Sequence, residues 1–262
     1  MKNTFLIFFT IISLAANAQT GTQKQVGMDG MWLGATAAAV LNDKLYTTEK
    51  NGTLVVTDLN TGMRKTVGKD GFGNNHFLFT SGNTLYMIDY AGTLSKIDHT
   101  TGTKEKLGTA ASFAGMTTFG VIDGTLFGVD TKGDLISADL VTGEKTVNGG
   151  SNHMNVSLMY VVNEKMYGVE KSGSLFEWAL NGGTRQMIGK YGDYASSFTG
   201  VAYNNGLYLV TKAGLLTFTK PGTAERTVIG KPIFGLTKYI FGANGKLYTI
   251  ETMGSLYEIV VK

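Results

Sequence analysis

The sequence predicts an all-β fold built from six repeats, and three observations support this prediction. Glycine occurs 36 times in 262 residues and proline only twice, a composition typical of short strands joined by tight turns rather than of helices. Hydrophobic residues make up 43% of the chain and charged residues 16%, with no charged block, which excludes a disordered protein. A strand-like pattern also recurs through the chain.

That pattern consists of leucine or methionine, an aromatic residue, any residue, a β-former, usually an acid, two variable residues, glycine, a variable residue and leucine. Its copies begin at Leu45, Leu85, Leu126, Met166, Leu207 and Leu247, with spacings of 40, 41, 40, 41 and 40 residues. A repeat of about 40 residues is typical of one four-stranded propeller blade. The sequence therefore predicts a six-bladed β-propeller of four-stranded antiparallel blades over residues 19–262.

Each repeat divides into four predicted strands. The first, as in 117–122, ends in a hairpin turn such as Asp123 to Thr125, and the motif itself forms the second. The motif glycine supplies the turn to a third strand, as in 94–98. A Thr-Gly turn then leads to the fourth strand, which reads TGMRKTVG from Thr61. Residues 35–40 favour a helix by composition, but their place in the repeat predicts a strand.

The two ends of the chain predict how the circle of blades closes. The sixth copy stops at Lys262 after its third strand, while TGTQKQVG, starting at Thr20, matches the fourth strand of the other copies. We expect the N-terminal strand to complete the last blade, because closure removes the exposed sheet edge that invites aggregation.

Residues 1–18 are predicted to be a cleavable signal peptide. Lys2 precedes an apolar run over 5–14, and Ala16-Asn17-Ala18 supplies small residues at the cleavage site. The apolar run is shorter than the roughly 20 residues that a membrane span needs. The chain has no cysteine, which excludes disulfides and thiolate chemistry and favours a bacterial export product. We expect a periplasmic or secreted protein without a membrane span.

The charge balance points away from nucleic acid as a partner. Without Lys2, the chain carries 22 basic and 20 acidic residues, and the basic ones are scattered singly. Such a weak, dispersed charge does not attract nucleic acid or an anionic membrane surface. We expect a monomer.

The blade pattern, G-x-LY-x-[VI]-[DE]-x-x-G-x-L followed by D-x-x-TG, resembles the broad superfamily of secreted propellers that includes quinoprotein-like, NHL and YVTN-type repeat proteins. The resemblance covers the whole predicted mature chain and implies a propeller architecture. Quinoprotein-like blades place a tryptophan in the outer strand, whereas this region holds Val67, Leu107, Val147 and Ile188. The resemblance therefore implies no bound quinone, and fold alone does not decide function.

Two circles of side chains are candidates for a site. Thirteen residues before each motif start lies a ring-bearing residue, and these six, here called the loop rings, are Trp32, Phe72, Phe113, His153, Tyr194 and Phe234. Five second strands end in an acid, and these acids are expected on the same face of the propeller as the loop rings. They are Glu49, Asp89, Asp130, Glu170 and Glu251. Rings near carboxylates can bind a sugar or a cation. Alternatively they hold the blade together, as in WD40-type propellers, with His153 and Glu170 as one such pair.

Departures from the repeat are more informative than the repeat itself. Thr211 replaces the acid in the fifth copy, and His76, Phe198 and Lys238 stand where other first strands carry small polar residues. Together they mark an asymmetric sector. The candidate ligand-binding residues are thus Trp32, Phe72, His76, Phe113, His153, Tyr194, Phe198, Phe234 and Lys238.

Motifs for catalysis are missing. The three histidines do not form a metal-binding spacing, and neither a GxSxG nor a phosphate-binding loop occurs, so no cofactor is expected. Calcium is the one alternative, because propeller hydrolases assemble calcium sites from single residues of different blades. The metal candidates are Asn74, Asn155, Asp89 and Glu170, supported by Asn75 and Asn152.

Loop lengths weigh against an enzyme, since six blades use nearly all of the chain and leave no lid to enclose a substrate. The sequence therefore favours an exported, non-catalytic binding module that presents one face to a protein, peptide or glycan. The alternative is a calcium-assisted hydrolase or lyase of the lactonase type with its site at the channel mouth. Trp178 is predicted to lie in the core between blades.

Overall fold

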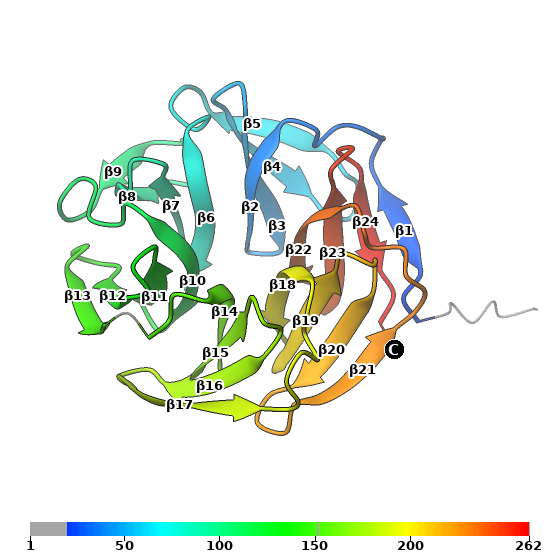
Figure 1. Cartoon of the computed structure of the whole chain (residues 1–262). Helices are drawn as coiled ribbons and strands as arrows, with labels where there is room; N and C mark the ends of the chain where they lie inside the picture. Colours follow the sequence, from blue (N-terminus) through cyan, green and yellow to red (C-terminus); the bar gives the residue numbers. More distant parts are fainter. Residues whose placement is uncertain (1–19, 151, 262) are drawn as a thin grey trace, which may run out of the picture.

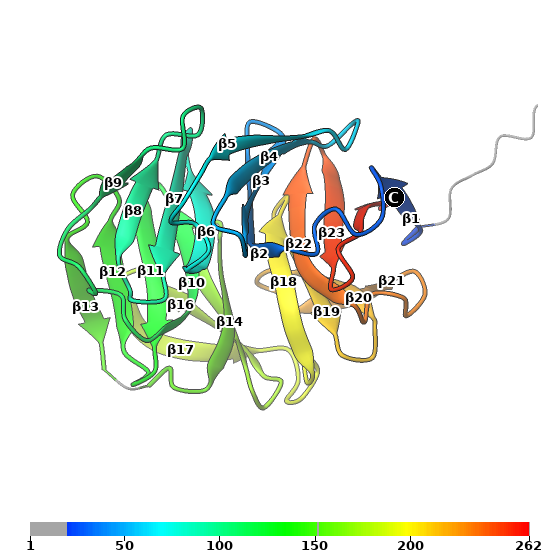
Figure 2. The ribbon, with the colours of Figure 1, turned by 90° about the horizontal axis from the view of Figure 1, so that it is seen from above.

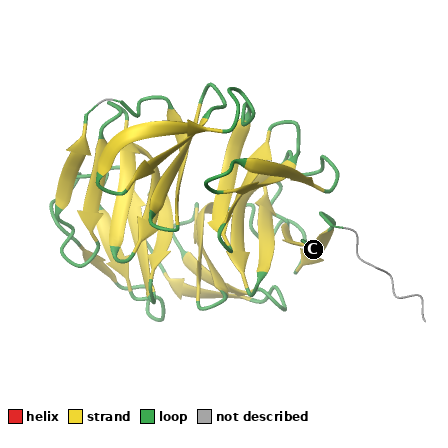
Figure 3. Ribbon diagram, turned by 90° about the horizontal axis from the view of Figure 1, so that it is seen from below, coloured by secondary structure: helices red, strands yellow, loops and turns green. Residues whose placement is uncertain are grey.

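The computed structural model describes residues 20–150 and 152–261 and arranges their strands in six four-stranded antiparallel sheets around a central axis (Figure 1). Strands and loops account for all of the described chain, as Figure 3 shows. The predicted six-bladed propeller is thus confirmed. The predicted signal peptide lies outside the described residues. Within them, no helix is long and apolar enough to span a membrane.

The blades follow one another along the chain. Blades 1 and 2 consist, from the axis outwards, of β2 (Ala35–Leu41), β3 (Lys44–Glu49), β4 (Leu54–Asp58) and β5 (Arg64–Gly68), and of β6 (Asn75–Ser81), β7 (Thr84–Asp89), β8 (Leu94–Ile97) and β9 (Lys104–Lys106). Blades 3 and 4 consist of β10 (Met116–Ile122), β11 (Thr125–Asp130), β12 (Leu135–Asp139) and β13 (Lys145–Gly149), and of β14 (Val156–Val162), β15 (Lys165–Glu170), β16 (Leu175–Ala179) and β17 (Gly182–Ile188). Blade 5 consists of β18 (Ser197–Tyr203), β19 (Gly206–Thr211), β20 (Leu216–Lys220) and β21 (Glu225–Ile229).

Blade 6 combines strands from both ends of the described chain. It contains β22 (Thr237–Ala243), β23 (Lys246–Glu251) and β24 (Leu256–Ile259), and β1 (Gln23–Val26) is its outermost strand. β1 runs antiparallel to β24, with Gln23 opposite Ile259 and Val26 opposite Leu256. Figure 2 shows β1, in dark blue, next to the C-terminal end of the chain.

Glycines at the outer rim let neighbouring blades approach closely. A Cβ atom on Gly62, in the Thr-Gly turn of blade 1, would lie 2.4 Å from the Cα of Gly27, which follows β1. A Cβ atom on Gly230, at the end of β21, would lie 2.7 Å from the Cα of Gly21. Only glycine tolerates such backbone contact. The segment around β1 therefore packs on both of its neighbours, blades 1 and 5.

The hydrophobic core lies between the blades in six clusters. The motif's first residue is buried in every blade, as is the aromatic residue that follows it, because successive strand residues face opposite sides and each blade packs between two others. Trp178 packs with Phe127 and Leu135 of blade 3 and with Val156 of its own blade. It is therefore a core residue between blades, as predicted.

Candidate functional site

The loops that join one blade to the next form one end of the propeller, here called the crossing-loop face, together with the turns between second and third strands. The opposite end, here called the hairpin face, holds the turns between first and second strands and between third and fourth strands. Every loop ring lies on the crossing-loop face and donates its backbone N–H to the carbonyl of a motif glycine. The six donor–acceptor distances run from 2.9 to 3.2 Å: Trp32 to Gly254, Phe72 to Gly52, Phe113 to Gly92, His153 to Gly133, Tyr194 to Gly173 and Phe234 to Gly214.

The six loop-ring side chains are buried, none being more than 5% exposed. In several blades a cation from the fourth strand lies over the ring. Arg64 lies 5.4 Å from the Trp32 ring centre, and Lys104 lies 4.8 Å from that of Phe72. The same cations donate hydrogen bonds to the backbone carbonyl that precedes the ring. These contacts assign the loop rings to the core, and they leave no accessible face on which a glycan or a ligand cation can stack.

This outer-strand cation was missed from the sequence, although a signal was present. Five of the six blades place a lysine or arginine 32 residues after the loop ring, namely Arg64, Lys104, Lys145, Arg185 and Arg226. In blade 6, Gln23 takes its place and lies 3.5 Å from Glu251. In blades 1 to 5, this cation donates a hydrogen bond to a carbonyl of the crossing loop and so fixes that loop to its blade.

The acids of the second strands are also engaged within the fold. Glu49 pairs with Arg64, and Glu170 pairs with Arg185. Asp89 accepts the backbone N–H of Thr93 at 2.8 Å. Thr211, which replaces the acid in blade 5, does the same for Leu215 at 3.2 Å and is buried. Thr211 therefore keeps the structural role of the acid and does not mark a site.

His153 does not form the expected pair with Glu170. Both of its ring nitrogens are buried and neither makes a hydrogen bond of good geometry, although the backbone of Gly133 lies close enough to interact with the ring, which lies 5.3 Å from that of Trp178. Burial, and secondarily the positive charge of Arg185, holds the pKa of His153 below its ordinary value of 6.5. The neutral imidazole occupies a position that holds Phe in three other blades.

We expect His153→Phe to raise the free energy of unfolding by about 1 to 2 kcal/mol, because it removes two buried polar atoms that make no hydrogen bond of good geometry. The gain should grow as the pH falls below 6.5. There the unfolded wild-type chain binds a proton at His153 that the folded chain does not yet bind, and this difference lowers the free energy of unfolding of the wild type. Urea unfolding at pH 8 and pH 5.5 measures both effects. His99→Phe, at the outer rim, is the control; a gain equal to that of His153→Phe would contradict the prediction.

A β-bulge near the start of each first strand leaves one residue of each blade unpaired at the crossing-loop end of the channel, and two of these residues, Thr117 and Ser157, line the cavity. In three blades this residue is a hydroxyl that turns back to a carbonyl of the second strand. Thr36 bonds to Thr48, Thr117 to Val129 and Ser157 to Val169, at 2.9 to 3.0 Å. In blades 2, 5 and 6 the same position holds His76, Phe198 and Lys238.

These three residues do not form the single sector that the sequence predicts, because blades 5 and 6 are neighbours but blade 1 separates blade 6 from blade 2. The His76 ring stacks 3.8 Å from Phe77 and 4.9 Å from the exposed Tyr90, and burial lowers its pKa. Lys238 donates its Nζ to the carbonyl of Ala35 in blade 1, and burial, together with the charge of Lys50, lowers its pKa. Phe198 is half-buried against the core between blades 5 and 6.

The four metal candidates fall into two separate pairs. Asn74 lies near Asp89 in blade 2, because its carbonyl accepts the N–H of Tyr90, the residue after Asp89. Asn155 lies near Glu170 in blade 4 in the same way, because its carbonyl accepts the N–H of Lys171. Blade 3 separates the pairs, and Glu170 is already bound by Arg185. Across residues 20–150 and 152–261, no group of three His, Asp or Glu side chains is placed to hold a metal ion. Calcium binding stays a prediction that these contacts do not support.

An exposed apolar patch lies on the same face, where blade 6 meets blade 1. Leu33 is 56% exposed, Leu236 53% and Met253 66%; we call these three residues the apolar arc. Leu33 packs against Gly254, next to Met253, and Leu236 accepts the N–H of Thr252 at 2.8 Å. The equivalent positions of the other repeats hold mostly glycine, alanine and polar residues, with only Met154 as an apolar exception. The blade architecture therefore does not require the arc.

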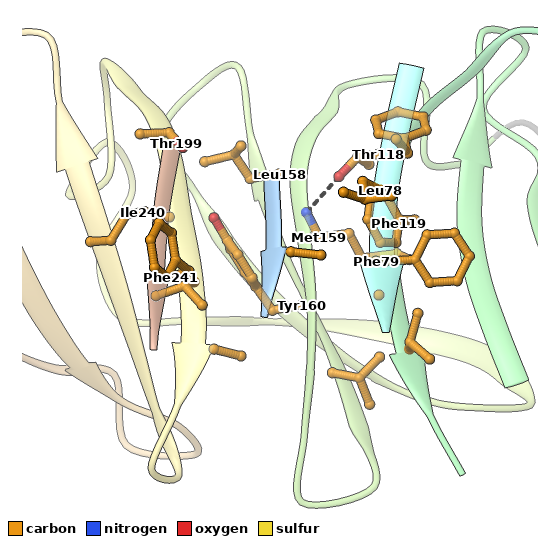
Figure 4. Close-up of a pocket in the computed structure, with 18 of the residues that line it drawn as sticks. Leu78, Phe79, Thr118, Phe119, Leu158, Met159, Tyr160, Thr199, Ile240 and Phe241 are labelled. Atoms are coloured by element: carbon orange, nitrogen blue, oxygen red, sulfur yellow. Dashed lines mark hydrogen bonds between the residues drawn. The ribbon is translucent and has the colours of Figure 1, made fainter. Parts of the chain in front are cut away.

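The central channel contains a cavity of about 510 Å³, and its wall is formed by the first strands of all six blades. The wall is mainly apolar, and Phe77 and Phe119, which belong to it, lie edge to face at 4.9 Å. Figure 4 shows side chains such as Phe119, Leu158 and Ile240 around the cavity, and the bond of 2.9 Å from Met159 N–H to the Thr118 hydroxyl.

The comparisons with known proteins identify the fold. No protein-family model and no curated protein sequence matches the chain. A Bacteroides thetaiotaomicron structural-genomics protein of unknown function superposes with a TM-score of 0.67 at 13% identity, covering 93% of this chain and 73% of that one. A nidogen–laminin complex gives 0.61 at 12% (74% and 79%), and YCF48 bound to D1 peptide gives 0.59 at 12% (87% and 78%). These likenesses agree with the propeller resemblance of the sequence.

Proposed function

We propose that this chain is a non-catalytic binding module that captures a protein or peptide on its crossing-loop face, with the apolar arc as the centre of contact. The arc is the observation that carries the proposal. Three large apolar side chains stand exposed where the repeat otherwise has mostly small or polar residues, and a contiguous exposed apolar patch is typical of a protein interaction site.

Residues next to the arc suit the rim of an interface. Lys238 follows Leu236 by two residues and reaches Ala35, which follows Leu33 by two residues. A polar and charged rim around an apolar centre is the usual anatomy of a protein interface. Two similar structures, a nidogen–laminin complex and YCF48 bound to D1 peptide, support the use of this fold for protein or peptide binding.

A protein or peptide fits the face better than a glycan does. The glycan hypothesis depended on stacking against the loop rings, and those rings are buried. We also propose that binding takes place outside the cytoplasm, since residues 1–18 have the features of a signal peptide. Sequencing the N-terminus of the exported protein should give Gln19 as the first residue. A protein that keeps residues 1–18 and stays inside the cell would contradict export.

A displayed library of random 12-residue peptides, selected against residues 19–262, tests the binding face. We expect Leu33→Glu and Met253→Glu each to weaken the selected peptides at least tenfold, because a charge in an apolar contact must be desolvated. The matched control is Val141→Glu, since Val141 is 79% exposed but lies on the hairpin face. Failure to enrich any peptide, or equal losses in all three variants, would overturn the proposal.

A further inference from the structure

We propose that the central channel is a separate binding site for a small amphiphilic carboxylate, whose apolar tail lies in the channel and whose carboxylate lies beside Lys238 at the crossing-loop mouth. This site shares Lys238 with the rim of the apolar arc but does not include the arc itself, and it does not depend on the proposed function.

The channel wall suits an apolar tail. Six first strands of seven residues line it, and strands of that length extend over about 23 Å. Phe77, Phe119 and Leu158 are only half-buried, and Val121 and Val161 add to the same wall. A cavity of about 510 Å³ is within the size range of small-molecule sites, and apolar surface facing it gains from contact with a tail rather than with water.

Lysines gather at the crossing-loop mouth, where an anionic head can meet them. The residue after the end of the second strand is a lysine in three blades, Lys50, Lys171 and Lys212, and Lys238 lies further in. On the hairpin face, the acids of the inner turns, Asp43, Asp123 and Glu164, are balanced by Lys44, Lys165 and Lys246. An anionic head is therefore favoured at the crossing-loop mouth by its lysines.

Lys238 lies at the crossing-loop end of β22, one of the strands that form the channel wall. It occupies the same repeat position as Thr117 and Ser157, which belong to the wall, and Ile240 and Phe241 of its own strand also belong to it. Its ammonium lies 5.3 Å from the Tyr239 ring centre and donates one hydrogen bond, to Ala35, which leaves donors for a carboxylate.

The acids that end the second strands around this mouth already have partners within the fold, including Glu251, which lies opposite Thr237 and accepts a hydrogen bond from Gln23 at 3.5 Å. Glu49, which lies near Lys238, is paired with Arg64, while Asp89 and Asp130 accept backbone N–H groups of their own turns. Among the described residues, none of the four ion pairs includes Lys50, Lys171, Lys212 or Lys238. A ligand carboxylate therefore meets cations without having to displace an acid from them.

Titration calorimetry with sodium dodecanoate, kept below its micelle concentration at pH 8, is the first test. We expect one site per chain, with dodecyltrimethylammonium binding at least tenfold more weakly because its head group is repelled by the lysines. Shortening the tail to decanoate and octanoate should lower the affinity about fourfold for each methylene removed. Equal binding of the cationic and anionic detergents, or the absence of binding, would overturn the proposal.

Variants locate the site within the chain. Lys238→Gln should weaken dodecanoate at least fivefold, and Ala38→Leu should weaken it further by filling the channel, while thermal melts report whether each variant is folded. Lys96→Gln, an exposed lysine on β8, is the matched control. Unchanged affinity in folded Lys238→Gln would place the ligand elsewhere and contradict the proposal. If Ala38→Leu does not fold, the tail-length series decides whether the channel holds the tail.

Discussion

Replacing Trp32 by alanine is expected to lower the free energy of unfolding by about 3 to 5 kcal/mol. The Trp32 side chain is fully buried, its Nε1 donates to the Thr57 hydroxyl at 3.3 Å, and the Arg64 guanidinium lies 5.4 Å from its ring centre. The substitution removes all three contacts and leaves a cavity between blades 6 and 1. Urea denaturation measures the loss.

Leu33→Ala is the control for Trp32→Ala, because Leu33 is the next residue of the same loop and is 56% exposed. It should change the free energy of unfolding by less than about 0.5 kcal/mol. Equal losses in the two variants would show that the loop as a whole, rather than the buried indole, stabilises the junction between the blades.

Deleting residues 20–27 is expected to destabilise the propeller by about 4 kcal/mol or more. The deletion removes β1, whose pairing with β24 contributes about 1 kcal/mol for each hydrogen bond, and the buried Val26, which contributes about 2 kcal/mol. It also leaves β24 as an exposed edge that can pair with another copy. Thermal melts and light scattering should report a lower midpoint and aggregation.

A synthetic peptide of residues 20–27 should restore the midpoint of this truncated chain in a concentration-dependent manner, since it binds only the folded state. The matched peptide carries Gly21→Val and Gly27→Val, which place Cβ atoms against Gly230 and close to Gly62. It should not restore stability. An unchanged midpoint after the deletion would contradict the role of β1 in holding the circle of blades together.

The repeat pattern predicted the fold because it is a property of strands and turns. The motif's first residue is buried and the Thr-Gly turns recur, so spacing alone defined the six blades. The same pattern did not show whether a repeated ring faces solvent or core. Trp32 and Leu33 are adjacent in one loop, yet Trp32 is buried and Leu33 is exposed. Trp32 is buried because Arg64 and Thr57 pack around its side chain, and the repeat pattern does not show these contacts.

The candidate site could be predicted only in part. His76, Phe198 and Lys238 stood out as departures from the repeat, and the structure brings them to one mouth through equivalent bulges. Thr211 also departed from the repeat, but its hydroxyl replaces the acid as an acceptor for the turn. The grouping of lysines at the crossing-loop mouth required the fold, because residues as distant in sequence as Lys50 and Lys238 come together only there.

The measurement that tests the account most directly compares Trp32→Phe with Leu33→Glu in both melting temperature and affinity for a selected peptide. We expect Trp32→Phe, which loses the bond to Thr57, to melt at a lower temperature and to bind the peptide with unchanged affinity. Leu33→Glu should melt as the wild type does and bind at least tenfold more weakly. The reverse pattern, with binding lost in folded Trp32→Phe and kept in Leu33→Glu, would contradict the separation of a structural core from a binding surface within this loop.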